Sequence, residues 1–345
     1  MNRYMCNDTS PNSYLNATAY VIQIKLVLAS IYVLPVISLI GNSLTIIVLQ
    51  TNQQLNRSSF AVYAKTLAIS DTLVLFCKLL SYENKRHQRP FKFLCIAFQF
   101  LAESAVLVSV WTVVLITTER AIIVLFPLHI KKFISGYRAR VLVILSAVLI
   151  TISSSRLLVI KMDKNINTRC QPRQEWIRYI EISLRITEFA YIYIPLTIIT
   201  VGNCLSCWTL RRALNERRSI LKSAIYKHKR LETNENQLII MLFIVTVMFI
   251  FYFMPFTVMR IIPRTGLFGK CFTSSGFSSY LLIRTLCEFM KDLNFCSHFF
   301  IYCISGRSFR NALGSLIREK IMRSLINKPR TIDKLLKTKD VITEL

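Results

Sequence analysis

Two charged residues stand side by side inside an apolar part of the sequence. Glu119 and Arg120 lie between the runs VVLIT and AIIVLF. Ionisable groups in such surroundings are costly unless they are paired or hydrated, so they are functional candidates by default. Asp71, at the end of the segment LAISD, is a second candidate of this kind. Further polar residues within the apolar runs are Asn42, Ser109, Asn294, His298 and Tyr302.

The apolar runs that contain these residues are long enough to cross a lipid bilayer. Of the 345 residues 53% are hydrophobic and 18% are charged, and a membrane-spanning helix needs about 20 apolar residues. Inside hydrocarbon each backbone amide must be bonded within its own segment, which favours helices. We therefore predict an all-α membrane protein, a bundle of seven transmembrane helices. The seven runs are 26–49, 60–80, 94–118, 141–160, 189–210, 238–262 and 280–304.

The distribution of charge predicts the orientation in the plasma membrane. The formal net charge is +26, which in a soluble protein would suggest nucleic acid, but cytoplasmic flanks of membrane helices also collect Lys and Arg. Segments 211–235 and 307–339 are basic and fall on one side of a seven-helix chain. This places the C-terminus in the cytoplasm and the N-terminus outside, although the outer segments 83–92 and 161–178 are basic too. The predicted parts are an outer tail (1–22), a membrane domain (23–304) and a cytoplasmic part (305–345).

The two terminal parts carry further signals. No apolar signal-peptide core is present at the N-terminus, so the first helix is expected to direct insertion. Asn7 and Asn16 begin glycosylation sequons on the predicted outer side. After the last span, apolar residues recur at helical spacing opposite cations, which predicts a short amphipathic helix on the lipid surface. The 4 His residues are scattered, and no catalytic or metal-binding constellation is visible, so an enzyme is not expected.

Several of these polar residues and prolines resemble motifs of rhodopsin-like (class A) G-protein-coupled receptors, in particular of peptide receptors. The resemblance covers nearly the whole chain, with altered motifs: Ala121 follows Arg120, Phe253 stands two residues before Pro255, and the last span reads HFFIY from His298. The matching residues are Asn42, Asp71, Glu119, Arg120, Pro127, Pro195, Pro255 and Tyr302. The resemblance also implies an outer disulfide between Cys95 and Cys170.

This resemblance implies a G-protein coupling switch made of Glu119, Arg120, Glu235 and Tyr302. Arg120 paired with Glu119 and Glu235 would hold the third and sixth helices together, and release would free it for a G protein. An isolated charge pair at the membrane surface is the alternative.

For Asp71, one interpretation is a polar network that binds sodium as an allosteric ion, and the other is a hydrogen-bonded core carboxyl. The network residues are Asn42, Asp71, Ser109, Asn294 and His298. No other cofactor is expected.

Residues predicted to face an outer cavity carry mixed charge, which suits a small peptide, most simply a neuropeptide. Mutual pairing, for example of Arg284 with Glu288, is the alternative for any one of them. The proposed pocket residues are Gln99, Glu103, Glu188, Phe253, Phe256, Arg260, Arg284 and Glu288. Cys6 and Cys271 could form a second bridge, whereas Cys77, Cys204, Cys207, Cys287, Cys296 and Cys303 are expected to be free thiols.

Other functions compete with that of a peptide receptor. The altered motifs are also compatible with a chemosensory receptor for small molecules or with a decoy receptor that binds without signalling. A transporter is disfavoured because the spans show no inverted repeat and no pair of broken helices.

Overall fold

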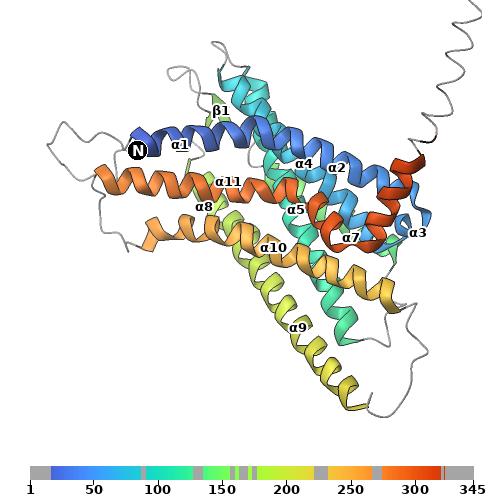
Figure 1. Ribbon diagram of the computed structural model, residues 1–345. Coiled ribbons are helices and arrows are strands. Elements are labelled where there is room, and N and C mark those ends of the chain that lie inside the picture. The colour runs from blue at the N-terminus through green and yellow to red at the C-terminus, as the bar shows by residue number, and fades with distance from the viewer. Residues whose placement is uncertain are drawn as a thin grey trace, which may run out of the picture.

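The computed structural model forms an elongated bundle of long helices (Figure 1). It describes residues 17–86, 91–126, 135–155, 160–162, 170–172, 177–220, 232–265, 274–319 and 322. Within this part of the chain seven long helical rods can be followed, two of which contain a short π-helical turn. The rods are α1–η2–α2 (Ala17–Leu28, Ala29–Val33, Leu34–Thr51), α4 (Ser59–Arg86), α5 (Lys92–Leu125), α7 (Gly136–Ser154), α8–η6–α9 (Ile177–Glu188, Phe189–Tyr193, Ile194–Ile220), α10 (Glu232–Thr265) and α11 (Ser274–Ser305).

Both π-helical turns are placed by prolines. The turns η2 and η6 end two residues before Pro35 and Pro195, respectively. A proline inside a helix lacks the N–H for the regular backbone bond, and its ring collides with the carbonyl of the preceding turn. A wider turn relieves that collision. The prolines therefore specify where two of the seven rods change from α-helical to π-helical geometry.

The first rod begins earlier than the apolar run indicates. Helix α1 starts at Ala17, so residues 17–22, assigned to the outer tail by the sequence pattern, are helical. At the other end of this rod a short helix, α3 (Gln53–Asn56), leads into α4. The Asn52 side chain caps α3 by accepting a hydrogen bond from the Leu55 amide at 3.1 Å.

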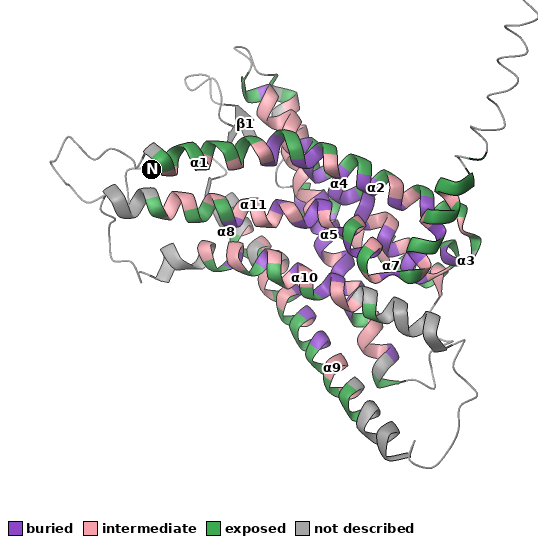
Figure 2. Ribbon diagram, in the orientation of Figure 1, coloured by how far each residue is buried: buried purple, intermediate pink, exposed green. Residues whose placement is uncertain are grey.

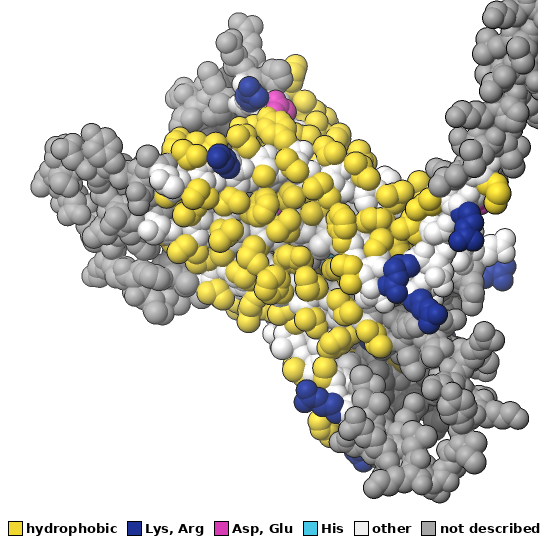
Figure 3. Space-filling view, viewed as in Figure 1, with side chains coloured by type: hydrophobic (Ala, Val, Ile, Leu, Met, Phe, Trp, Pro, Cys, Tyr) yellow, Lys and Arg dark blue, Asp and Glu magenta, His cyan; other side chains and the backbone are white. Residues whose placement is uncertain are grey.

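The outer surface of the bundle is apolar. Four described helical stretches are long and apolar enough to cross a membrane, and shorter apolar stretches occur in α9 and α10. Hydrophobic side chains cover the face formed by α1, α11 and α10, and Lys and Arg gather near the end that carries α3 (Figure 3). The four stretches are Thr18–Thr51, Ser59–Arg86, Ile96–Ile123 and Gly136–Ser154.

The core lies where α2, α4, α5, α10 and α11 meet (Figure 2). Phe253 stacks on Phe249 with ring centroids 4.3 Å apart and meets Phe295 edge-on at 6.2 Å, which joins α10 to α11. Helices α5 and α9 approach closely at Gly202, where an added Cβ would lie 2.7 Å from a methyl carbon of Thr117. This approach is possible because glycine has no side chain.

A short helix follows α11, as the sequence predicts. Residues 307–319 are helical, and Phe309 and Ala312 on this helix are buried. The Phe309 ring lies 5.7 Å from that of Tyr302 and 6.2 Å from that of Phe299. The helix is therefore packed against the end of the bundle opposite to the start of α1 (Figure 1).

A small antiparallel hairpin lies near the other end of the bundle. Strand β1 (Ile160–Met162) pairs with β2 (Cys170–Pro172), with Met162 opposite Cys170. Strand β1 contacts α5, the helix that carries Cys95. The hairpin thus brings the segment holding Cys170 towards α5.

Candidate functional site

The Glu119 carboxylate is held by side chains from a neighbouring helix. Ser59 donates to Glu119 Oε1 at 2.6 Å, and the Tyr63 hydroxyl donates to Oε2 at 2.8 Å. Arg120 Nη2 lies 3.7 Å from Oε1, which is an ion-pair distance. Both charged side chains are largely buried, at 11% exposure for Glu119 and 12% for Arg120. The pair is therefore part of the packed bundle and not an isolated surface contact.

Ser59 and Tyr63 were missed by the sequence interpretation. They are four residues apart on α4 and therefore share one face of this helix. This shared face is the only signal that the sequence offered, and it gives no partner. That the partner is Glu119 follows from the packing of α4 on α5.

The contacts described for Arg120 leave part of its guanidinium without a hydrogen-bond acceptor. Its Nε is buried and has no hydrogen-bond partner within the described part of the chain. Glu235, the second predicted partner, belongs to α10, but its side chain lies outside the described residues. Helices α5 and α10 are in contact, so the pairing of Arg120 with Glu235 stays a prediction.

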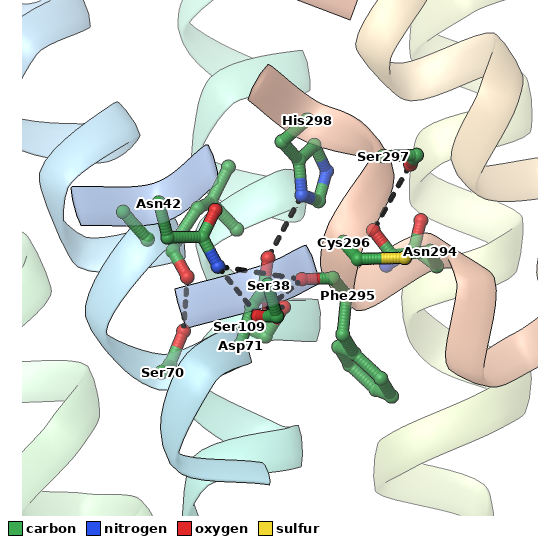
Figure 4. A network of polar contacts seen from close by, with 12 residues as sticks. Ser38, Asn42, Ser70, Asp71, Ser109, Asn294, Phe295, Cys296, Ser297 and His298 are labelled. Atoms are coloured by element: carbon green, nitrogen blue, oxygen red, sulfur yellow. Dashed lines mark hydrogen bonds and ion pairs between the residues drawn. The ribbon is translucent and has the colours of Figure 1, made fainter. Parts of the chain in front are cut away.

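Asp71 forms the second polar centre, deep in the bundle (Figure 4). Ser109 donates to Asp71 Oδ1 at 2.5 Å, and His298 Nδ1 lies 2.8 Å from Oδ2. Asp71 and His298 are both buried. These contacts join α4, α5 and α11. Of the predicted polar network, the structure therefore brings Asp71, Ser109 and His298 together.

The two asparagines of that network are not bonded to Asp71 in the described contacts. Asn42 Nδ2 donates to Ser38 Oγ at 2.9 Å and to Thr72 Oγ1 at 3.0 Å, and it lies 3.4 Å from the Phe295 carbonyl oxygen. Asn294 Nδ2 is buried without a described partner. The predicted network is thus divided into two groups, one around Asn42 and one around Asp71 (Figure 4).

This arrangement does not fit a bound sodium ion at Asp71. Each carboxylate oxygen of Asp71 already has one polar contact, Oδ1 with Ser109 and Oδ2 with His298, and a sodium ion would compete with these contacts. The His298 ring nitrogen lies 2.8 Å from Oδ2, so a cation at that oxygen would have to displace the ring or share the oxygen with it. The interpretation of Asp71 as a hydrogen-bonded core carboxyl fits the geometry better.

Tyr302 lies between the polar centre and the short helix that follows α11. Its ring meets Phe60 edge-on at 5.5 Å and stacks near His298 at 6.3 Å. Its hydroxyl is buried without a described partner. Because Phe60 follows Ser59 in the sequence, Tyr302 lies at the same end of the bundle as the Glu119–Arg120 pair.

The predicted ligand-pocket residues fall into three groups. In the first group the contacts are known. Phe253 is buried in the aromatic core, and the centre of the Phe256 ring lies 4.6 Å from Lys291 Nζ. Arg284 pairs with Glu288 at 3.2 Å, which is the mutual pairing given above as the alternative to ligand binding. Gln99 and Glu103 lie on α5 with partly buried side chains. The side chains of Glu188 and Arg260 lie outside the described residues.

The covalent features are described in part. Six cysteines are free thiols, as predicted: Cys77, Cys204, Cys207, Cys287, Cys296 and Cys303. The side chains of Cys95 and Cys170 lie outside the described residues, as do Cys6, Cys271, Pro127 and the sequon residues Asn7 and Asn16. Both disulfides and both glycosylation sites therefore stay predictions.

Comparison with known proteins defines the class of this bundle. A family profile described as "7 transmembrane receptor (rhodopsin family)" matches residues 41–304. The chain belongs to this family, and the prediction of a seven-helix receptor fold is confirmed. It is a G-protein-coupled receptor of the plasma membrane, with an extracellular ligand and a G protein as partners, and it is not an enzyme.

The similar proteins include growth hormone secretagogue receptors and cysteinyl leukotriene receptors. The chain is 24% identical to growth hormone secretagogue receptor type 1 of Homo sapiens over 328 residues, covering 91% of this chain and 84% of the relative. It is 25% identical to the same receptor of Oryctolagus cuniculus, covering 84% and 80%. It is also 24% identical to cysteinyl leukotriene receptor 1 of Mus musculus, covering 86% and 83%.

Proposed function

We propose that this receptor binds a small peptide at the end of the bundle where α1 begins and signals through Arg120 at the opposite end. The observation that carries the proposal is the Glu119–Arg120 pair, buried and held by Ser59 and Tyr63. The N-terminus would then be extracellular and the C-terminus cytoplasmic.

The orientation is supported by charge. Described Lys and Arg side chains gather at the end that carries α3 (Figure 3), and the segment 307–319 is exposed at Arg307, Arg310 and Arg318. Cytoplasmic flanks collect such residues. The Glu119–Arg120 pair is at this end as well, where a cytoplasmic G protein could reach it.

The switch consists of two arrangements of one arginine. In the arrangement observed, Arg120 forms an ion pair with Glu119, which is itself held by Ser59 and Tyr63 of α4. Movement of the neighbouring helices would break the 3.7 Å ion pair and leave the guanidinium, with its five N–H donors, free for an acceptor on the G protein. A ligand that binds the second arrangement more tightly would shift the population towards it.

A peptide ligand is supported by the mixture of groups in the other half of the bundle. Glu103, Phe256 and Lys291 come from three different helices there, and such a set suits a ligand with charged and apolar parts. The names of the relatives denote receptors for growth hormone secretagogues and for cysteinyl leukotrienes. A small-molecule ligand is thus the alternative that the test must separate.

The test is a peptide-library screen on cells that express the chain together with sensors for each class of G protein. A response to one family of peptides supports the proposal. A response to non-peptide compounds alone would favour the chemosensory interpretation, and binding without any G-protein activation would favour a decoy.

The role of Arg120 is tested by comparing Arg120→Ala with Arg140→Ala. We expect Arg120→Ala to reduce stimulated nucleotide exchange to background while surface expression and ligand binding persist. Arg140, an exposed residue of α7 that donates to the Gly136 carbonyl, is the matched control and should leave signalling unchanged. Normal signalling by Arg120→Ala would disprove the switch.

A further inference from the structure

A cluster of three charged side chains lies inside the bundle and is separate from the two polar centres described above. Lys78 of α4 forms an ion pair with Asp292 Oδ2 of α11, and Lys291 Nζ lies 3.6 Å from Asp292 Oδ1. Ser30 of η2 donates to Asp292 Oδ2 at 2.6 Å and accepts from Lys78 Nζ at 2.5 Å. Each oxygen of this carboxylate therefore faces one ammonium group.

The lysines point into the bundle and not towards lipid. Lys78 lies seven residues after Asp71, and residues two helical turns apart share a face. Leu75, also on that side of α4, is fully buried. The exposed apolar face of α4 is elsewhere, at Ile69, Leu73 and Phe76. Lys291 likewise precedes the buried His298 by seven residues.

The cluster is closer to the end of the bundle where α1 begins. Seven residues of helix correspond to a rise of about 10 Å, so the ammonium groups are displaced by roughly that distance from the Asp71–His298 pair. The displacement is towards the end at which we propose that the ligand enters.

The charges of the cluster do not cancel. In the described part of the chain two ammonium groups face one carboxylate, which leaves one positive charge in excess, and an unpaired ion is costly in such surroundings. Asp292 is closed off, with only 2% of its side chain exposed, whereas the side chains of Lys78 and Lys291 are 38% and 23% exposed. The negative group is therefore sealed while the positive groups are accessible.

We propose that Lys78 and Lys291 bind a carboxylate of the ligand, with Asp292 as the fixed anion that positions both lysines. Each ammonium has three N–H donors. In the described contacts Lys78 uses two of its donors, one on Asp292 and one on Ser30. A second carboxylate would neutralise the excess charge. The Phe256 ring beside Lys291 Nζ offers an apolar surface for the group next to that carboxylate.

This inference rests on the proposed function in one respect: the source of the carboxylate is taken to be a peptide, through its C-terminus or an acidic side chain. A fatty acid presents the same chemistry. The two sources differ in the chain attached to the carboxylate, so they can be compared directly.

The test measures thermal unfolding of the purified full-length receptor in lipid nanodiscs, a readout that does not require a G protein. The peptide probe is N-acetyl-Leu-Phe with a free carboxylate, compared with its C-terminal amide. The fatty-acid probe is decanoate, compared with methyl decanoate. We expect a free acid to bind about tenfold or more tightly than its neutral partner, because hydrogen bonds to charged groups are strong. A larger effect for the peptide acid supports the peptide source, and a larger effect for decanoate assigns the site to fatty acids.

Lysine variants test whether Lys78 causes the preference for the acid probes. Lys78→Gln should remove the preference for the acid and leave binding of the neutral partner unchanged, whereas Lys78→Arg should keep the preference. Lys85→Gln, on the same helix but exposed, is the matched control and should behave like the unchanged receptor.

Two results would overturn the proposal. One is equal stabilisation by acid and neutral probes, or by none of them, in the unchanged receptor. The other is an acid preference that survives Lys78→Gln and Lys291→Gln together. Failure of the peptide-receptor proposal would appear separately, as absence of a peptide response in the G-protein screen.

Discussion

The hydrogen bonds that hold Glu119 can be tested without a ligand, because they should control the basal activity of the receptor. Tyr63→Phe removes the 2.8 Å hydrogen bond to Glu119 Oε2, and Ser59→Ala removes the 2.6 Å hydrogen bond to Oε1. Both changes leave the apolar part of the side chain nearly unchanged. If these bonds are made only while Arg120 is held, their loss destabilises that arrangement selectively.

The expected size of the effect follows from the type of bond. A hydrogen bond to a charged group contributes about 1.5–3 kcal/mol, and every 1.4 kcal/mol corresponds to a factor of about ten. Each donor and the Glu119 side chain are largely buried, so solvent does not weaken these bonds much. Tyr63→Phe should therefore shift the equilibrium about tenfold or more towards the released arrangement. The two changes together approach the ~5.5 kcal/mol that moves a population from 1:99 to 99:1.

The assay is ligand-independent nucleotide exchange on a panel of heterotrimeric G proteins, at matched surface expression. We expect a rise with each single variant and near-maximal activity with the double variant. Tyr137→Phe is the matched control, because this tyrosine is 70% exposed and makes no described hydrogen bond. The basal activity of the Tyr137→Phe receptor should be unchanged. Unchanged basal exchange in the well-expressed double variant would refute the reasoning.

Two further predictions concern the core. Replacing choline chloride by sodium chloride at constant ionic strength should leave the melting temperature of the unchanged receptor the same, because a sodium ion at Asp71 would compete with the contacts of His298 and Ser109. His298→Asn should make the melting temperature rise with sodium, and a sodium-dependent shift in the unchanged receptor would contradict the geometry. Gly202→Ala should destabilise the receptor by about 1–3 kcal/mol, because the added Cβ would lie 2.7 Å from a methyl carbon of Thr117. The measurement is the melting temperature, which should fall. An unchanged melting temperature would show that α9 can move aside.

Much of the fold could be predicted from the sequence, because a membrane restricts which backbone structures can cross it. Long apolar runs must become helices when no water is available to the backbone. The two π-helical turns end two residues before Pro35 and Pro195. Glu119 and Arg120 could be selected as functional candidates because ions are rare in such runs.

The partners of the polar residues were predictable only in part. His298 was expected near Asp71 from the resemblance to the receptor family, and the structure places its ring 2.8 Å away. Asn42 and Asn294 were expected in the same network, but the described contacts of Asn42 lead to Ser38 and Thr72 instead. A spacing along one helix gives the face of a residue and not the residue opposite to it.

The sequence by itself therefore determined that this protein is a bundle of membrane helices and which of its residues carry unusual charge. Only the tertiary structure decided that Ser59 and Tyr63 hold Glu119, and that Lys78 of α4 meets Asp292 of α11. The physical reason is that helical periodicity is a local property. The rotation and height of one helix against another depend instead on side-chain packing over the whole bundle.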